Sequence, residues 1–158
     1  MAGSLAKTAP AGFLERTWVK EQVTEILQAF GMEGYHKIAG RATIMVDYDE
    51  KVVYGVGAVR SDGWLNCIAV RKGHQRKGIG SKIVRWLIAK SPVDSLWLET
   101  MFWNRRFYES LGFRHVPIGK VREQFGCDPR GRKNTMVMTL DRHSQPRYSV
   151  WLQTPSSP

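Results

Sequence analysis

Cysteine is scarce in this sequence of 158 residues, where only Cys67 and Cys127 occur. Two cysteines without metal-ligand spacing exclude a disulfide-rich secreted scaffold and a cysteine-based zinc site. Long apolar runs are missing too, because no stretch approaches the roughly 20 residues that span a bilayer. Residues 1–18 also lack the continuous apolar core of a signal peptide. We therefore expect reduced thiols, no membrane segment and a cytoplasmic location.

Two widespread phosphate-binding patterns are absent. The NTPase loop requires GxxxxGK followed by Ser or Thr, and the dinucleotide-binding fingerprint requires GxGxxG. Neither occurs in this chain. A nucleotide-binding loop of either kind is therefore excluded by the motifs.

Acidic residues are in the minority, with 14 Asp and Glu against 24 Lys and Arg, which gives a net charge of +10. A basic surface raises the local concentration of an anionic ligand. The charge is compatible with a cofactor that carries phosphates, with an acidic protein partner and with a nucleic acid. Charge alone does not decide among these three.

Apolar periodicity and turn residues outline one domain over residues 1–158, with loose tails at 1–12 and 142–158. Gly55 and Gly57, inside a predicted strand, indicate a bulge or close packing on a neighbour. His36 is expected to be an ordinary surface or packing residue. The predicted helices are 15–30, 79–88 and 101–111, and the predicted strands are 42–48, 51–60, 64–70, 95–100, 113–118 and 135–140, with short strands near 12–14 and 148–152 and a long basic loop at 119–134.

The stretch 64–90 contains the most informative pattern. Its first part, WLNCIAV, predicts a strand, and SKIVRWLIAK has apolar residues at helical spacing. Between them lies RKGHQRKGIG, a basic turn with three glycines. Glycines let a phosphate approach the backbone closely, and the free amides at a helix start attract negative charge. The pattern therefore predicts an anion site at the start of the helix.

Two segments identify a family resemblance. The run Gln75-Arg76-Lys77-Gly78-Ile79-Gly80 resembles the acetyl-CoA loop of the GCN5-related N-acetyltransferases (GNAT), whose pattern is Gln or Arg, two residues, Gly, any residue, Gly or Ala. The run Phe107-Tyr108-Glu109-Ser110-Leu111-Gly112-Phe113 resembles the second signature of that family. The resemblance implies an α+β fold in which helices flank a mixed, mostly antiparallel β-sheet. It also implies direct transfer of an acetyl group from acetyl-CoA to a primary amine.

The resemblance further implies which residues hold acetyl-CoA. Backbone amides of the glycine loop would bind the pyrophosphate, with basic side chains such as Lys72 nearby. The edge of strand 64–70 would pair with pantetheine, and an amide near Ile68 or Val70 would donate to the thioester oxygen. Asn104 departs from the family pattern because it lies only four residues before Tyr108, and N-capping is its alternative role. The cofactor-binding candidates are Ile68, Ala69, Val70, Arg71, Gln75, Arg76, Lys77, Gly78, Ile79, Gly80, Ser81 and Asn104.

Two catalytic roles follow from the same resemblance. Tyr108 occupies the position of the general acid that protonates the leaving sulfur, and its alternative is a buried packing tyrosine. Glu99 is the carboxylate best placed to serve as general base, although strand alternation could equally turn it to solvent. Cys67 is expected to be a half-buried thiol and not a nucleophile.

An alternative function is directed at nucleic acid. The basic loop 119–134 would then bind RNA or DNA, either in a transferase that acts on a nucleic-acid-linked amine or in a binding module without catalysis. The acceptor and the general base stay open at this point, and so does the oligomeric state, with a homodimer as one alternative.

Overall fold

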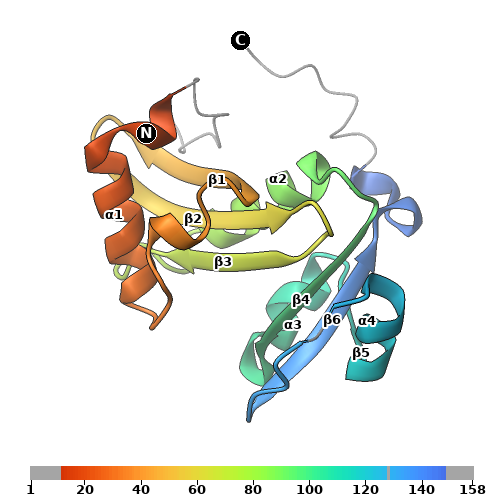
Figure 1. Ribbon diagram of the computed structural model, residues 1–158. Helices are drawn as coiled ribbons and strands as arrows, with labels where there is room; N and C mark the ends of the chain where they lie inside the picture. Colours follow the sequence, from red (N-terminus) through yellow and green to blue (C-terminus); the bar gives the residue numbers. More distant parts are fainter. Residues whose placement is uncertain (1–11, 128, 149–158) are drawn as a thin grey trace.

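The computed structural model describes residues 12–127 and 129–148 (Figure 1). The strands are β1 (Ala42–Asp49), β2 (Val52–Arg60), β3 (Leu65–Val70), β4 (Ser95–Met101), β5 (Arg114–Val116) and β6 (Thr135–Asp141). The helices are α1 (Thr17–Gln28), α2 (Ile79–Lys90), α3 (Arg105–Ser110) and α4 (Ile118–Phe125). Short 3-10 helices cover Phe13–Glu15, Tyr35–Lys37, Phe102–Asn104 and Arg142–Ser144. The predicted α+β class is confirmed.

The strands form two antiparallel sheets of three, with the orders β1-β2-β3 and β4-β6-β5. β6 therefore lies between β4 and β5 and pairs antiparallel with both. The sheets meet where Trp64 forms a parallel bridge with Trp97, and the Trp97 amide donates to the Gly63 carbonyl at 3.0 Å. The two segments run parallel at this bridge, as expected for strands that a helical crossover connects. Beyond it β3 and β4 diverge (Figure 1).

A bulge interrupts β3 just before the divergence. Val56 pairs with Ala69 and Ala58 with Asn66, so two residues of β3 lie opposite one residue of β2. Cys67, one of the two, has a φ of +57°. A bulge of this kind bends the strand and re-aims its side chains, which favours the separation of β3 from β4.

The glycines of β2 are explained by close packing on α2. An ideal Cβ at Gly55 or Gly57 would lie 2.7 Å from a carbon of the Ile83 side chain, inside any normal contact. Side chains at these positions would push α2 off the sheet. Their predicted role in close packing is confirmed.

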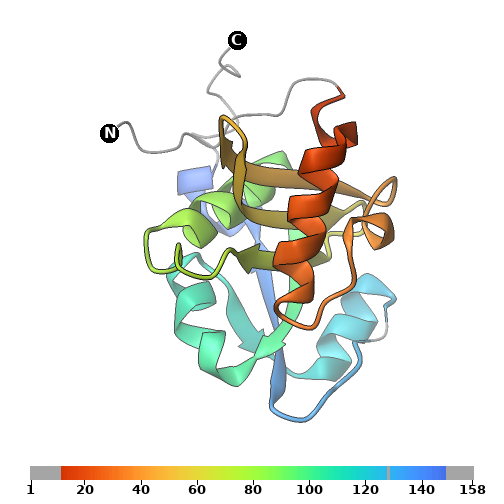
Figure 2. The same ribbon diagram turned by 90° about the vertical axis from the view of Figure 1, so that its left-hand side faces the viewer.

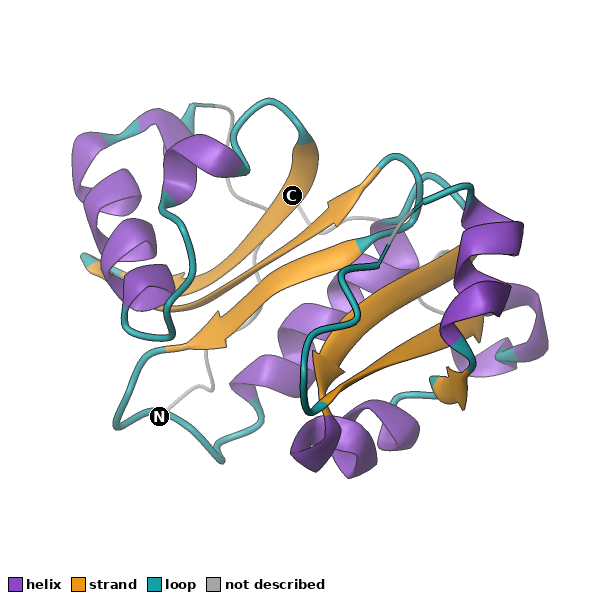
Figure 3. Ribbon diagram, turned by 60° about the horizontal axis from the view of Figure 1, so that its bottom comes forward, coloured by secondary structure: helices purple, strands orange, loops and turns teal. Residues whose placement is uncertain are grey.

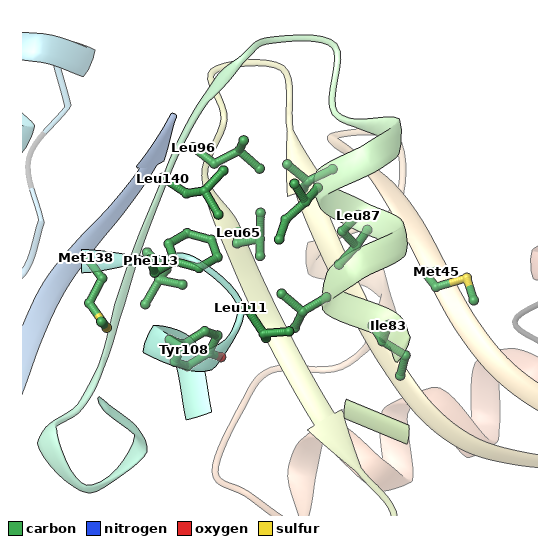
Figure 4. Close-up of a cluster of buried hydrophobic side chains, with 14 of the residues drawn as sticks. Met45, Leu65, Ile83, Leu87, Leu96, Tyr108, Leu111, Phe113, Met138 and Leu140 are labelled. Atoms are coloured by element: carbon green, nitrogen blue, oxygen red, sulfur yellow. The ribbon is translucent and has the colours of Figure 1, made fainter. Parts of the chain in front are cut away.

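Helices cover both faces of the first sheet (Figure 2; Figure 3). On one face α1 buries Val19, Val23 and Leu27 against β1 and β2. On the other, α2 packs on β1–β3, and the same cluster continues onto α3 and the second sheet (Figure 4). Burying each such aliphatic side chain contributes about 1.5–3 kcal/mol. One continuous core thus fixes both sheets relative to α2.

Two predictions about the periphery are wrong, one for residues 12–14 and one for residues 119–134. Residues 12–14 do not form a strand, because Phe13–Glu15 is a 3-10 helix with Phe13 in the core. The loop expected at 119–134 begins as helix α4, because Val121 packs against Trp97 and Val137.

The tail expected at 142–158 is not loose over 142–148. Arg142 is buried and donates to three carbonyls, those of Ile88, Ala89 and Ser91. Its guanidinium also forms an ion pair with Asp94 at 2.6 Å. Tyr148 is buried and donates its hydroxyl to the Leu111 carbonyl. The strand expected at 148–152 lies almost wholly outside the described residues, as does the tail expected at 1–12.

Within the described ranges, no helix combines the length and the hydropathy needed to cross a bilayer.

Candidate active site

The glycine turn delivers the start of α2 into an open space. Gly78 occupies the N-cap position with a φ of +82°, and an ideal Cβ there meets no atom within 4 Å. A positive φ of this size favours glycine, and Arg76, at +62°, shows that the turn is tight. The first amides of a helix of 12 residues have no partners within the helix and carry its positive dipole end. This end of α2 is therefore suited to bind an anion.

A cavity of about 990 Å³ opens where β3 and β4 diverge. β3 and the glycine turn form one side, and the end of β4 with α3 forms the other. Segments around Phe30 and Thr135 complete the wall. Ten of the twelve cofactor-binding candidates line this cavity, namely Ile68, Ala69, Val70, Gln75, Arg76, Gly78, Ile79, Gly80, Ser81 and Asn104.

Arg71 and Lys77 are not among the residues that line the cavity. The Arg71 guanidinium points to α1 instead, where it donates to Glu25 at 3.1 Å and to Gln22 at 3.0 Å. It also donates to the carbonyl of Val53 at 2.8 Å. Arg71 therefore ties the end of β3 to α1, a contact between distant segments that local sequence does not reveal.

Tyr108 lies at the wall of the cavity and is 7% exposed. Its ring packs edge-on against Phe107 and Phe113, with centroids 4.9 and 5.8 Å away. Burial raises the pKa of the Tyr108 phenol well above its ordinary value, because the phenolate would lose its hydration. Tyr108 is both a core residue and a hydroxyl that stays protonated near neutral pH.

Glu99 lines the same cavity from β4. Leu98 belongs to the core that contains Tyr108. Glu99 shares the other face of β4 with Trp97, and its cross-strand partner is Val137. Trp97 and Val137 both pack on the α4 side. Strand alternation therefore places Glu99 and Tyr108 on opposite faces of the second sheet. The Glu99 carboxylate accepts a hydrogen bond from the Gly131 amide at 2.9 Å, which fixes its position.

Asn104 and Cys67 also line the cavity. The Asn104 amide donates to the Thr100 hydroxyl at 3.1 Å, so its side chain does not cap α3 although the residue occupies the N-cap position. Burial raises the pKa of the Cys67 thiol, and a nearby Arg60 opposes this only in part. A neutral thiol is a weak nucleophile, in keeping with the expected half-buried role.

Several wall residues were not predicted as site residues. Trp103 lines the cavity with 63% of its surface exposed, and Phe102 packs edge-on against it. Phe30 and Arg132 reach the wall from segments far away in sequence. The run Met101-Phe102-Trp103, directly after a strand, was the available signal, since large apolar residues gathered on a surface often mark a binding site. Arg132 had no signal beyond its charge.

No metal site accompanies this cavity in residues 12–127 and 129–148, where no three His, Cys, Asp or Glu side chains are grouped to hold an ion.

Solved structures of several acetyltransferases resemble this fold. Rv2747 from Mycobacterium tuberculosis, in complex with CoA and NLQ, has 15% identity and a TM-score of 0.60, covering 80% of this chain and 95% of its own. The ribosomal-protein-S18-alanine N-acetyltransferase from Escherichia coli has 23% identity and a TM-score of 0.58, with 80% and 89% coverage. Tetrahymena GCN5 has 15% identity and a TM-score of 0.60, with 88% and 94% coverage. No curated protein matches the chain significantly in sequence.

The family comparison covers the part of the chain that builds the cavity. The model of the acetyltransferase (GNAT) domain matches residues 28–115, more than half of the chain. This range includes the glycine turn, the diverging strands, Glu99 and Tyr108. The chain therefore belongs to the GNAT acetyltransferase family.

Proposed function

We propose that the protein transfers an acetyl group from acetyl-CoA to a primary amine by direct attack. The observation that carries the proposal is the single cavity that unites the start of α2, the free edge of β3, Glu99 and Tyr108. Membership of an acetyltransferase family and the CoA complex of one structural relative support acetyl-CoA as the donor.

The glycine turn would hold the donor. Amides from Gln75 to Ser81 would bind the pyrophosphate, helped by the positive end of α2. After the bridge between Trp64 and Trp97, β3 pairs only with β2 and forms the edge of its sheet. The backbone near Ile68 and Val70 can therefore pair with the pantetheine amides at this edge. One amide of this edge would donate to the thioester oxygen and stabilise the negative charge that develops there.

Glu99 and Tyr108 would handle the protons. Glu99 would take a proton from the amine, whose nitrogen forms a bond to the carbonyl carbon of the thioester. The carbon–sulfur bond then breaks, and Tyr108 would give its proton to the departing thiolate, which leaves as CoA with a free thiol. Because the two side chains lie on opposite faces of the sheet, the donor and the acceptor would approach from opposite sides. This separation keeps the base near the amine and the acid near the sulfur.

Two measurements test the proposal. Acetyl-CoA should raise the melting temperature of the protein. A panel of amines, peptides and tRNA should then reveal an acceptor through release of the CoA thiol. A melting temperature unchanged by acetyl-CoA at millimolar concentration would contradict the proposal.

The nucleic-acid alternative has no finding that favours it, and it stays a prediction. Nucleic-acid binding with a steep salt dependence, together with no response to acetyl-CoA, would support it in place of the transferase. Cys67 and Cys127 are both present as thiols, which suits a reducing compartment such as the cytoplasm.

A further inference from the structure

The cavity wall contains three charged residues in the described part of the chain, namely Arg76, Glu99 and Arg132. On the proposed function, Arg76 belongs to the pyrophosphate turn and Glu99 serves the amine. Arg132 has no assigned role. We infer that Arg132 binds an anionic group on the acceptor, so that the preferred acceptors are amines with a carboxylate or phosphate close to the amino group. The inference rests on the proposed function and names the class of its acceptor.

The backbone places Arg132 beside the proposed base. The Gly131 amide donates to Glu99 at 2.9 Å, and Arg132 is the next residue in the chain. The Arg132 carbonyl in turn accepts from the Thr135 amide at 3.1 Å and from the Thr135 hydroxyl at 2.5 Å. These bonds anchor the turn at the start of β6, and Thr135 lines the cavity as well. Glu99 and Arg132 are thus held together although they are distant in sequence.

The side chain of Arg132 has the chemistry that an anion requires. Arg132 is an exposed residue, and no carboxylate of the described residues forms an ion pair with it. A guanidinium presents a planar set of donors that matches a carboxylate or a phosphate with two parallel hydrogen bonds. Because Arg132 lines the cavity, its long side chain can reach such a group on a bound molecule.

Charge balance selects the acceptor. Amines are mostly protonated near neutral pH, and an ammonium ion would be attracted by Glu99 but repelled by Arg132. A molecule with both an ammonium and an anionic group matches the pair, with the ammonium near Glu99 and the anion near Arg132. A simple alkylamine has no group to offset the repulsion. The wall therefore favours zwitterionic acceptors over plain amines.

The experiment compares matched acceptors with two variants. Phenylalanine and phenylethylamine differ by one carboxylate, and phosphoethanolamine and ethanolamine differ by one phosphate. The kcat/KM value of each is measured for the unchanged protein, for Arg132→Gln and for Arg130→Gln. Arg130 is exposed, lies two residues away, and is not among the cavity-lining residues, so it controls for the loss of one positive charge. Binding of each acceptor in the presence of CoA is followed by calorimetry, so that the readout does not depend on turnover.

We expect the protein to prefer at least one anionic member of the pairs by about 10-fold to 100-fold, the range for a hydrogen bond to a charged group. Arg132→Gln should abolish that preference, and Arg130→Gln should preserve it. Preference for the carboxylate pair or for the phosphate pair identifies which anion is bound.

Three results would overturn the inference while acetyl-CoA still binds. The first is equal use of anionic and plain amines, and the second is an equal loss in both variants, which would indicate a diffuse basic field. The third is a failure of both anionic acceptors to bind or react. If acetyl-CoA itself does not bind the protein, the proposed function fails, and this result is distinct from the other three.

Discussion

The substitution Gly78→Asp tests the glycine turn most directly. The position has a φ of +82°, and a side chain would enter empty space at the start of α2. Gly73 supplies a matched control, because its φ is +87° and a Cβ there also meets nothing within 4 Å. Each Asp adds about 1 kcal/mol of backbone strain and the same negative charge. Of these two glycines, only Gly78 lines the cavity and forms the N-cap of α2, so the comparison isolates the position at the helix start.

The expected loss of affinity is large. A carboxylate about 4 Å from one phosphate charge raises the free energy of the complex by about 4 kcal/mol at an effective dielectric constant of about 20. This corresponds to roughly 1000-fold weaker binding, since about 1.4 kcal/mol is a factor of ten. Isothermal titration with acetyl-CoA measures the effect, and thermal unfolding without the ligand measures the strain. Gly73→Asp should unfold at a similar temperature and keep most of the affinity.

Two results would refute this reasoning. One is a Gly78→Asp variant that binds acetyl-CoA as tightly as the unchanged protein. The other is an equal loss of affinity in Gly73→Asp, because the effect would then come from the charge of the whole turn and not from a phosphate held at the helix start.

Three more predictions concern catalysis and stability. Tyr108→Phe should lower kcat by about 10²-fold to 10⁴-fold and leave the Kd for acetyl-CoA unchanged. Assays of CoA release measure kcat, and calorimetry measures the Kd. Glu99→Gln should lower kcat/KM for the acceptor by a similar factor, and an unchanged value would remove Glu99 as the base. Arg142→Met should lower the free energy of unfolding by about 3 kcal/mol or more, because buried carbonyls lose their donor. Urea titrations measure this change, and Arg114→Met, at an exposed position, should alter the free energy of unfolding by under about 0.5 kcal/mol. The hydrogen bond from Arg142 lowers the pKa of Asp94 in the folded state. The stability contributed by this Arg142–Asp94 ion pair is therefore complete above the ordinary pKa of the carboxyl, and it is lost as the pH falls through the lowered pKa of the folded state.

Local patterns predicted most of the fold. The apolar spacing of α1 and α2 is a strong signal, because each helix buries one face of regular period. β1 and β6 are apolar runs of strand length whose central residues are buried. The helix α4 was missed since only Val121 is fully buried in it, and its basic and polar residues resemble a loop. Arg142 and Tyr148 were assigned to a loose tail because their stabilising contacts lie far away in sequence.

The site was predicted unevenly for the same reason. Gly78 and its neighbours form one continuous motif, so the sequence located them together. Arg71 was expected to contact phosphate because of its position, but Glu25 and Gln22 of α1 hold its guanidinium. Arg132 was only one charge in a basic segment until the fold placed it beside Glu99.

The sequence by itself determined the chemical character of the turn at 71–81, since short-range order is enough to combine glycines, cations and a helix start. Tertiary structure decided which groups share a cavity, because the bulge at Cys67 and the close packing of α2 on Gly55 and Gly57 arise only when distant segments meet. It also placed Glu99 and Tyr108 on opposite faces of one sheet. Such relations arise from packing between distant segments, which no local pattern encodes.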